Sequence, residues 1–205
     1  MIDAPVVRSA SGDDLDALVE IQYSEPTAEL VGLAGSPARA RRFGRALARS
    51  EGIHESTRPV VVIDGPDGPI AFMAYSIGPA KSVALTPTLA VRAVAALGPS
   101  VFGLPRRLGA LNSVQLVAPE HSLYIAELHV HPKHRGQGLG GHLLTWSSDR
   151  SRELGLSQRS LITGISNPAI HLYERHGFTI TATATDERYE RVFGRKGRVL
   201  MTAPA

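Results

Sequence analysis

A glycine-rich segment between a β-rich run and a helical run carries the strongest chemical signal in the sequence. Glycines stand at positions 136, 138, 140 and 141, directly after Arg135. Glycine allows close approach of the backbone to a ligand and positive φ angles. The first N–H groups of a helix lack partners within the helix, and the helix dipole adds positive charge there, so such a turn suits a phosphate or pyrophosphate. Four glycines exceed what a tight turn requires, and we therefore expect an anion-binding loop.

The same glycines, at 136, 138 and 141, also fit the dinucleotide-binding fingerprint G-x-G-x-x-G, which is weak evidence when it stands alone. A Rossmann domain would place an acidic residue near the end of the next strand, about twenty residues on, for the ribose. Here the next β-rich run, 160–165, is followed by Ser166 and Asn167. This context disfavours a nicotinamide cofactor, and tight NADH binding would restore that alternative.

Titratable side chains gather in and just after the β-rich run 123–130, which leads into the glycine-rich loop. They are Glu127, His129, His131 and His134. A carboxylate or an imidazole beside a reacting group can act as a general base. An H-x-H pair can also bind a metal, but the third ligand would be a loop histidine and no carboxylate is obviously placed, so we expect no metal site. The absence of cysteine excludes cysteine-based metal sites and cysteinyl intermediates.

The rest of the chain shows the elements that would position these groups. Apolar residues at alternating or helical spacing predict strands and helices respectively. The expected strands are 5–8, 60–64, 70–77, 123–130, 160–165, 178–185 and 198–202, and the expected helices are 11–23, 36–50, one that follows the glycine-rich loop and ends near 155, and 167–177. The order predicts one α/β (α+β) domain over 1–205, with a central mixed sheet.

Residues 80–118, between the third and fourth expected strands, are rich in Ala, Leu, Pro and Gly. A short helix is expected over 88–97. Val101, Leu104, Leu108 and Leu111 have helical spacing, which predicts a second apolar helix face. We expect a helical insertion at about 80–118. Its apolar faces need a partner, either as a lid in the open cleft of the sheet or as a dimer interface with a second subunit.

Two motifs together resemble the GNAT N-acetyltransferase superfamily. Arg135-Gly-Gln-Gly138-Leu-Gly140 matches its R/Q-x-x-G-x-G/A signature, and residues 167–178 match its second motif, N-x-x-A-x-x-L-Y-x-x-x-G-F. The resemblance implies a GNAT-type mixed, mostly antiparallel sheet flanked by helices, from which the helical insertion between the third and fourth strands is a departure. It also implies acetyl-CoA as co-substrate, without a metal, and direct acetyl transfer to a primary amine of a small molecule, peptide or protein.

The resemblance further implies roles for individual residues. Tyr173 would donate a proton to the leaving thiolate, and Glu127 would be the base, directly or through water, with His129, His131 or bulk water as alternatives. The implied cofactor-binding residues are Leu128, His129, Val130, Arg135, Gly136, Gln137, Gly138, Leu139, Gly140, Gly141 and Asn167. The purely structural alternatives are a helix N-cap role for Asn167 and an aromatic packing role for Tyr173.

Composition limits the partners. Lys and Arg number 22 against 19 Asp and Glu, and a net charge of +3 is weak evidence for nucleic acid. The sequence has neither a membrane-spanning apolar run nor a recognisable signal at residues 1–10, so we expect a cytoplasmic protein without membrane partners. The alternative function is a catalytically weak acyl-CoA-binding sensor or interaction module. The acceptor amine stays open, as does the oligomeric state, although homodimers are common in the superfamily.

Overall fold

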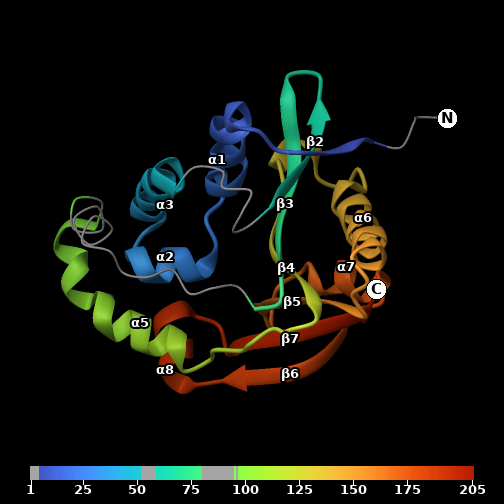
Figure 1. Cartoon of the computed structure of the whole chain (residues 1–205). Coiled ribbons are helices and arrows are strands. Elements are labelled where there is room, and N and C mark those ends of the chain that lie inside the picture. Colours follow the sequence, from blue (N-terminus) through green and yellow to red (C-terminus); the bar gives the residue numbers. More distant parts are fainter. Residues whose placement is uncertain (1–4, 52–58, 80–94, 96) are drawn as a thin grey trace.

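The computed structural model describes residues 5–51, 59–79, 95 and 97–205 of the chain. Within this part, one sheet contains seven strands in the order β1-β2-β3-β4-β5-β7-β6 (Figure 1). The strands are β1 (Val7–Ser9), β2 (Val60–Gly65), β3 (Gly68–Ile77), β4 (Ser122–Val130), β5 (Gln158–Gly164), β6 (Thr179–Thr185) and β7 (Gly197–Pro204). Only β4 and β5 pair in parallel. The expected mixed, mostly antiparallel sheet is confirmed.

The helices confirm most of the sequence expectations. Those described are η1 (Gly12–Asp14), α1 (Leu15–Ser24), α2 (Ala28–Ala34), α3 (Pro37–Glu51), η2 (Gly98–Gly103), α5 (Leu104–Asn112), η3 (Pro132–His134), α6 (Leu139–Glu153), α7 (Ile170–Arg175) and α8 (Glu187–Phe193). The sequence analysis missed α2 and α8, because seven residues give too little periodicity to detect. Among the described helices, none has the length and apolar character needed to cross a membrane.

The two faces of the sheet pack against different helices (Figure 1). The larger apolar cluster, which we call the α6 face, joins β-strand residues such as Met73 and Ile125 to Leu143 and Leu144 of α6. The opposite face, the α1 face, buries Phe72 together with residues of α1. Successive side chains of a strand point to opposite faces, so these two clusters show where each neighbouring side chain points.

The described part of the insertion, from residue 97 onward, packs apolar side chains within the chain. Val101 and Leu104 pack in a cluster with residues of α2 and α3, and Leu111 packs in a cluster with Tyr189 and Phe193 of α8. The sequence analysis had considered only the open cleft or a second subunit as partners, and that choice was incomplete. Most of the expected helix over 88–97 lies outside the described residues.

Asp14 anchors the start of α1 and is only 7% exposed. Its carboxylate accepts hydrogen bonds from Arg8 Nη1 at 2.8 Å and Arg8 Nη2 at 2.9 Å, and from the Ser11 N–H at 2.7 Å. Arg8, by its hydrogen bonds, lowers the pKa of Asp14 to about 2 against burial, which acts in the opposite direction. A depressed carboxyl pKa stabilises the fold above the unfolded value, near 4, and this stabilisation is lost as pH falls toward 2.

We therefore expect Asp14→Asn to lower the free energy of unfolding by about 1–2 kcal/mol at pH 7, discounted because Arg8 is partly exposed. The variant should also lose less stability than the parent between pH 4 and pH 2. Urea unfolding at pH 7 and pH 3 measures both effects, and exposed Asp13→Asn is the matched control. Equal unfolding free energies for parent and Asp14→Asn at pH 7 would contradict this role.

Candidate active site

The parallel strands β4 and β5 separate within the sheet. Their register extends from Ser122–Gln158 to Ile125–Leu161, whereas β4 continues to Val130 and β5 to Gly164. Beyond Ile125, the edge of β4 that faces β5 has no strand partner in the described part of the chain. Such an edge can pair with an extended ligand through backbone hydrogen bonds. The predicted residues Leu128, His129 and Val130 lie on this open stretch.

A β-bulge at Ala126 sets the direction of the side chains on this stretch. Tyr75 of β3 pairs with Ile125 and Ala74 pairs with Glu127, so Ala126 is the extra residue. A bulge shifts the alternation of side chains by one position. Leu123 and Ile125 point to the α6 face before the bulge, and Leu128 and Val130 do so after it. Glu127 and His129 consequently point to the α1 face.

Glu127 and His129 form a direct pair on that face. The distance from His129 Nε2 to Glu127 Oε2 is 2.8 Å, and the side chains are 17% and 34% exposed for His129 and Glu127. The His129 ring also stacks on Phe72, with centroids 5.1 Å apart and planes at 22°. The sequence analysis treated the two residues as alternative bases, and the structure brings them together. His131, the other alternative, accepts a hydrogen bond from the Lys133 N–H in the loop.

Tyr173 is both a packed aromatic and a protonated phenol. It is 8% exposed and meets Phe178 edge to face, with ring centroids 6.1 Å apart. Burial raises the pKa of Tyr173 to about 12, and the negative charge of Glu127 acts in the same direction. The hydroxyl therefore stays protonated at neutral pH. Tyr173 packs in the cluster of the α6 face, whereas Glu127 points to the α1 face.

The four glycines after Arg135 divide into two pairs. Gly136 and Gly138 have φ angles of 77° and 81°, so they provide the turn that leads into α6. A Cβ on Gly140 would lie 3.1 Å from Leu172 Cδ2, and one on Gly141 would lie 2.9 Å from His176 Nε2. The second pair therefore allows α6 to pack closely against α7. Packing against α7 thus explains two of the four glycines, and the anion-binding interpretation rests on Gly136 and Gly138.

The loop residues between and after these glycines differ in what they can offer a ligand. Gln137 is exposed, whereas the side chain of Leu139 is buried in the core, so only the backbone of Leu139 can face the loop. Gly138 precedes the first turn of α6 and its cap has no side-chain hydrogen bond. Backbone N–H groups are thus the donors that this loop presents.

Arg135 is held by a residue that the sequence analysis did not single out. Its Nη1 lies 2.7 Å from Oε2 of Glu25, and its Nε donates to the Val130 carbonyl at 3.4 Å. Both charged side chains are more than half exposed. Glu25 directly follows α1, so this ion pair connects the glycine-rich loop to the segment between α1 and α2.

Asn167 is used by the local structure. Its Oδ1 accepts a hydrogen bond from the Ala169 N–H at 3.0 Å, and its Nδ2 donates to Thr163 Oγ1 at 2.6 Å. These contacts form a turn just before α7, whose N-cap is Ala169 without a side-chain hydrogen bond. Asn167 is therefore a turn residue and not the N-cap that was the alternative to cofactor binding. Helix α7 itself begins at Ile170, a few residues after the expected start.

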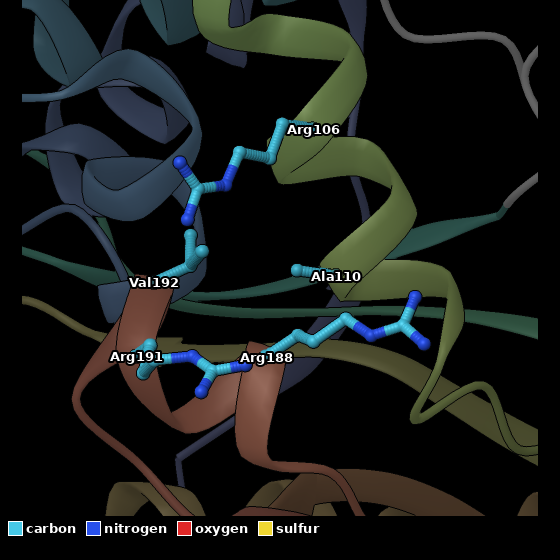
Figure 2. A pocket seen from close by; sticks show the side chains of 5 residues that line it. All are labelled: Arg106, Ala110, Arg188, Arg191 and Val192. Carbon is cyan, nitrogen blue, oxygen red and sulfur yellow. The ribbon is translucent and has the colours of Figure 1, made fainter.

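A small pocket of about 130 Å³ lies between α5 and α8 and contains none of the predicted site residues. It is lined by Arg106, Ala110, Arg188, Arg191 and Val192 (Figure 2). All three arginines are exposed, and Figure 2 shows the guanidinium groups of Arg106 and Arg188 extending in different directions. The pocket therefore does not present a converging set of donors to one ligand.

Comparison with known proteins identifies the class to which this fold and site belong. The family model described as "Acetyltransferase (GNAT) family" matches residues 54–178. The chain belongs to this family, and the resemblance seen in the sequence motifs is confirmed.

Two relatives match a shorter part of the chain. Streptothricin acetyltransferase of Streptomyces lavendulae is 38% identical over 72 residues, which cover 35% of this chain and 38% of the relative. The L-amino acid N-acyltransferase MnaT of Escherichia coli K12 is 38% identical over 66 residues, which cover 31% of this chain and 34% of the relative. The matches thus span about a third of the length of either relative.

Solved structures share the fold over nearly the whole chain. The ribosomal-protein-S18-alanine N-acetyltransferase of Escherichia coli has a TM-score of 0.57 at 18% identity, with 97% of this chain and 92% of that chain covered. The PaiA N-acetyltransferase of Thermoplasma acidophilum, in complex with coenzyme A, has a TM-score of 0.59 at 14% identity, with 98% of each chain covered. At these identities the likeness shows the fold alone.

Proposed function

We propose that the protein is an N-acetyltransferase that transfers an acetyl group from acetyl-CoA directly to a primary amine. The observation that carries this proposal is the arrangement at the end of β4, where an open strand edge, the Glu127–His129 pair and the glycine-rich entry to α6 follow one another. Family membership supports acetyl-CoA as the co-substrate, as does the coenzyme A bound to the Thermoplasma structural neighbour.

The residues present fit such a co-substrate. Gly136 and Gly138 have positive φ angles, and no atom would lie within 4 Å of a Cβ on either one, so a diphosphate could approach this backbone closely. The open edge of β4 offers backbone groups to an extended arm. Acetyl-CoA supplies the acetyl group as a thioester. The N–H groups of β4 near His129 and Val130 would stabilise negative charge on the reacting oxygen.

The Glu127–His129 pair provides the proton acceptor. A lysine-type ammonium, with a pKa near 10.4, is only about one part in a thousand unprotonated at neutral pH. A base positioned within hydrogen-bond reach, or one water away, removes that proton as the amine attacks. His129 can accept it while the adjacent carboxylate of Glu127 orients the ring and stabilises its charged form.

Tyr173 provides the proton for the leaving thiolate. A tyrosine hydroxyl is ordinarily protonated at physiological pH, and burial followed by Glu127 raises the pKa of Tyr173 further, to about 12. The negative charge of Glu127 disfavours the tyrosinate form of Tyr173. Tyr173 therefore holds a proton to donate while the Glu127–His129 pair accepts one. This division between a basic pair and an acidic phenol is what general acid–base catalysis of acyl transfer requires.

A thiol-release assay with acetyl-CoA over a panel of amines and peptides tests this function. The two relatives are named for different acceptors, streptothricin and L-amino acids, so the panel should contain both kinds. We expect thiol release that depends on both acetyl-CoA and an amine. Binding of acetyl-CoA by calorimetry, without turnover on any amine, would contradict the proposal and favour the acyl-CoA-binding sensor.

A charge reversal at the loop tests the site of the pyrophosphate. Arg135→Glu should weaken acetyl-CoA binding by roughly ten- to a thousandfold, because it places a negative charge beside the expected phosphates. Glu25→Gln should instead strengthen binding about two- to fivefold, because Glu25 competes with the phosphates for Arg135. Calorimetry measures both affinities, and thermal melting checks the fold. An Arg135→Glu variant with parental affinity and an unchanged melting temperature would remove Arg135 from the site.

A further inference from the structure

Two arginines lie over the C-terminal end of β5. Arg198 of β7 is paired in register with Gly164, the last residue of β5. Arg195 precedes β7, and its Nη1 lies 3.4 Å from the position that a Cβ on Gly164 would occupy. Val199 and Met201 of β7 pack in the cluster of the α6 face, so alternation directs Arg198 to the α1 face.

This is the face and the end of the sheet where the proposed base lies. Glu127 and His129 also point to the α1 face, and the stacking of His129 on Phe72 shows the same orientation independently. β4 and β5 run parallel, so their C-terminal ends lie at the same end of the sheet. The arginines and the base pair therefore stand on the two sides of the opening between β4 and β5.

The arginines lack a directly paired anion. In the described part of the chain neither Arg195 nor Arg198 forms an ion pair, and Arg198 Nε is buried without a hydrogen-bond partner. A buried donor without a partner is costly and uncommon, so it calls for an explanation. A ligand that supplies the missing acceptor is a direct one.

The neighbouring charges leave a positive excess. Glu29 of α2 places its Oε1 3.8 Å from the Cβ position of Gly164, and that oxygen accepts a hydrogen bond from the Tyr189 hydroxyl at 2.9 Å. Burial and then Glu29 raise the pKa of Tyr189, whereas Arg198 and Arg195 act to lower it, so Glu29 and both arginines act on the same hydroxyl. Glu29 supplies one negative charge near the two positive charges of Arg195 and Arg198. A second carboxylate would make this group of side chains neutral.

We propose that the acceptor is an amino acid, with its free carboxylate bound by Arg198 and Arg195 and its amino group directed to Glu127 and His129. This inference rests on the proposed function. A guanidinium matches a carboxylate through two parallel hydrogen bonds, which fixes orientation as well as charge. β4 and β7 flank β5, and paired strands lie about 5 Å apart, so β4 and β7 are at least about 10 Å apart where β4 diverges from β5. A long arginine side chain together with a small zwitterion would bridge that opening. Gly164 has no side chain to obstruct it.

Matched acceptors test the inference. Each L-amino acid is compared with its C-terminal amide and with the amine that lacks the carboxylate, in a steady-state thiol-release assay. We expect the parent to favour the amino acid by at least about tenfold in kcat/KM, since loss of a polar partner leaves buried groups unpaired. The amide has the less basic amine, so any chemical bias works against the expected result.

Variants then assign the preference to the arginines. Arg198→Gln should raise the KM for the amino acid about ten- to a hundredfold and leave kcat/KM for the decarboxylated amine within about twofold. Arg195→Gln gives the same test if Arg198→Gln does not fold. Arg191→Gln on α8, which lines the separate pocket, is the matched control and should behave as the parent. Acetyl-CoA affinity and the melting temperature are measured for each variant.

The outcomes separate this inference from the function on which it rests. Equal or better turnover of decarboxylated amines, or a uniform loss on all acceptors in both folded arginine variants, would overturn the inference and leave the acetyltransferase intact. No turnover on any amine would overturn the proposed function and this inference with it. A carboxylate preference that disappears in the Arg198 or Arg195 variant, but not in the Arg191 control, would support it.

Discussion

Glu127→Gln lowers acetyl transfer at pH 7 by about 10²–10⁴-fold and leaves acetyl-CoA affinity unchanged, if the pair on β4 is the base. The amide keeps the size of the carboxylate but can neither accept a proton nor stabilise a charged His129, which lies 2.8 Å away. The defect should shrink as pH approaches the pKa of the amine itself, because the acceptor then needs no base. Initial rates from pH 6 to pH 9, together with calorimetry, measure both features.

The second member of the pair sharpens this experiment. His129→Gln should lower the rate to a similar degree, and the double variant should lose little more than either single one, because residues that act as a unit are not additive. Additive losses would show that the two residues act separately. A Glu127→Gln variant with the parental rate across the whole pH range would assign proton removal to another group or to water.

Tyr173→Phe lowers kcat by about 10²–10⁴-fold without a comparable loss of stability. Phenylalanine keeps the buried ring and its edge-to-face contact with Phe178, and only the hydroxyl is lost. Because the pKa of Tyr173 is about 12, this hydroxyl is protonated from pH 6 to pH 9. The defect should therefore be independent of pH over that range, in contrast to the defect of Glu127→Gln.

Tyr75→Phe is a suitable control for that experiment, since Tyr75 is another buried tyrosine in the cluster of the α6 face. Its hydroxyl interacts with Arg150 of α6 and has no assigned role in the reaction. A Tyr173→Phe variant with parental kcat would restrict Tyr173 to packing. A defect of Tyr173→Phe that changes with pH would instead indicate that Tyr173 exchanges a proton with Glu127 or His129.

Features that depend on a few adjacent residues were predictable from the sequence. Pro37 begins α3 as expected, because its fixed φ angle suits the first turn of a helix. Gly138 precedes α6 with a positive φ angle, as the glycine-rich pattern indicated. The use of Asn167 by the local structure is likewise a short-range feature, since its partners are Ala169 and Thr163. In each case the chemistry of the residue acts on its immediate neighbours.

Features that depend on distant residues were not predictable. Glu25 and Arg135 are 110 positions apart, and neither composition nor periodicity connects them. The same holds for Arg198 and Gly164, which the order of β5 and β7 brings together. The face to which Glu127 and His129 point likewise depends on pairing with β3, because the bulge at Ala126 sets it. That the two side chains share a face follows from their spacing of two residues in one strand.

The bulge at Ala126 has a consequence for the register of β4. Without it, regular alternation after Ile125 would direct Glu127 and His129 into the apolar core and leave Leu128 and Val130 on the opposite face. The free energy of burying a carboxylate excludes that straight alternative, so the apolar pattern itself holds the bulge in place. Yet a β4 strand that lacked Ala126 would place the same side chains in the core without a bulge. The extra residue is thus redundant for folding, and its presence is better explained by the local bend that it gives the strand beside the opening.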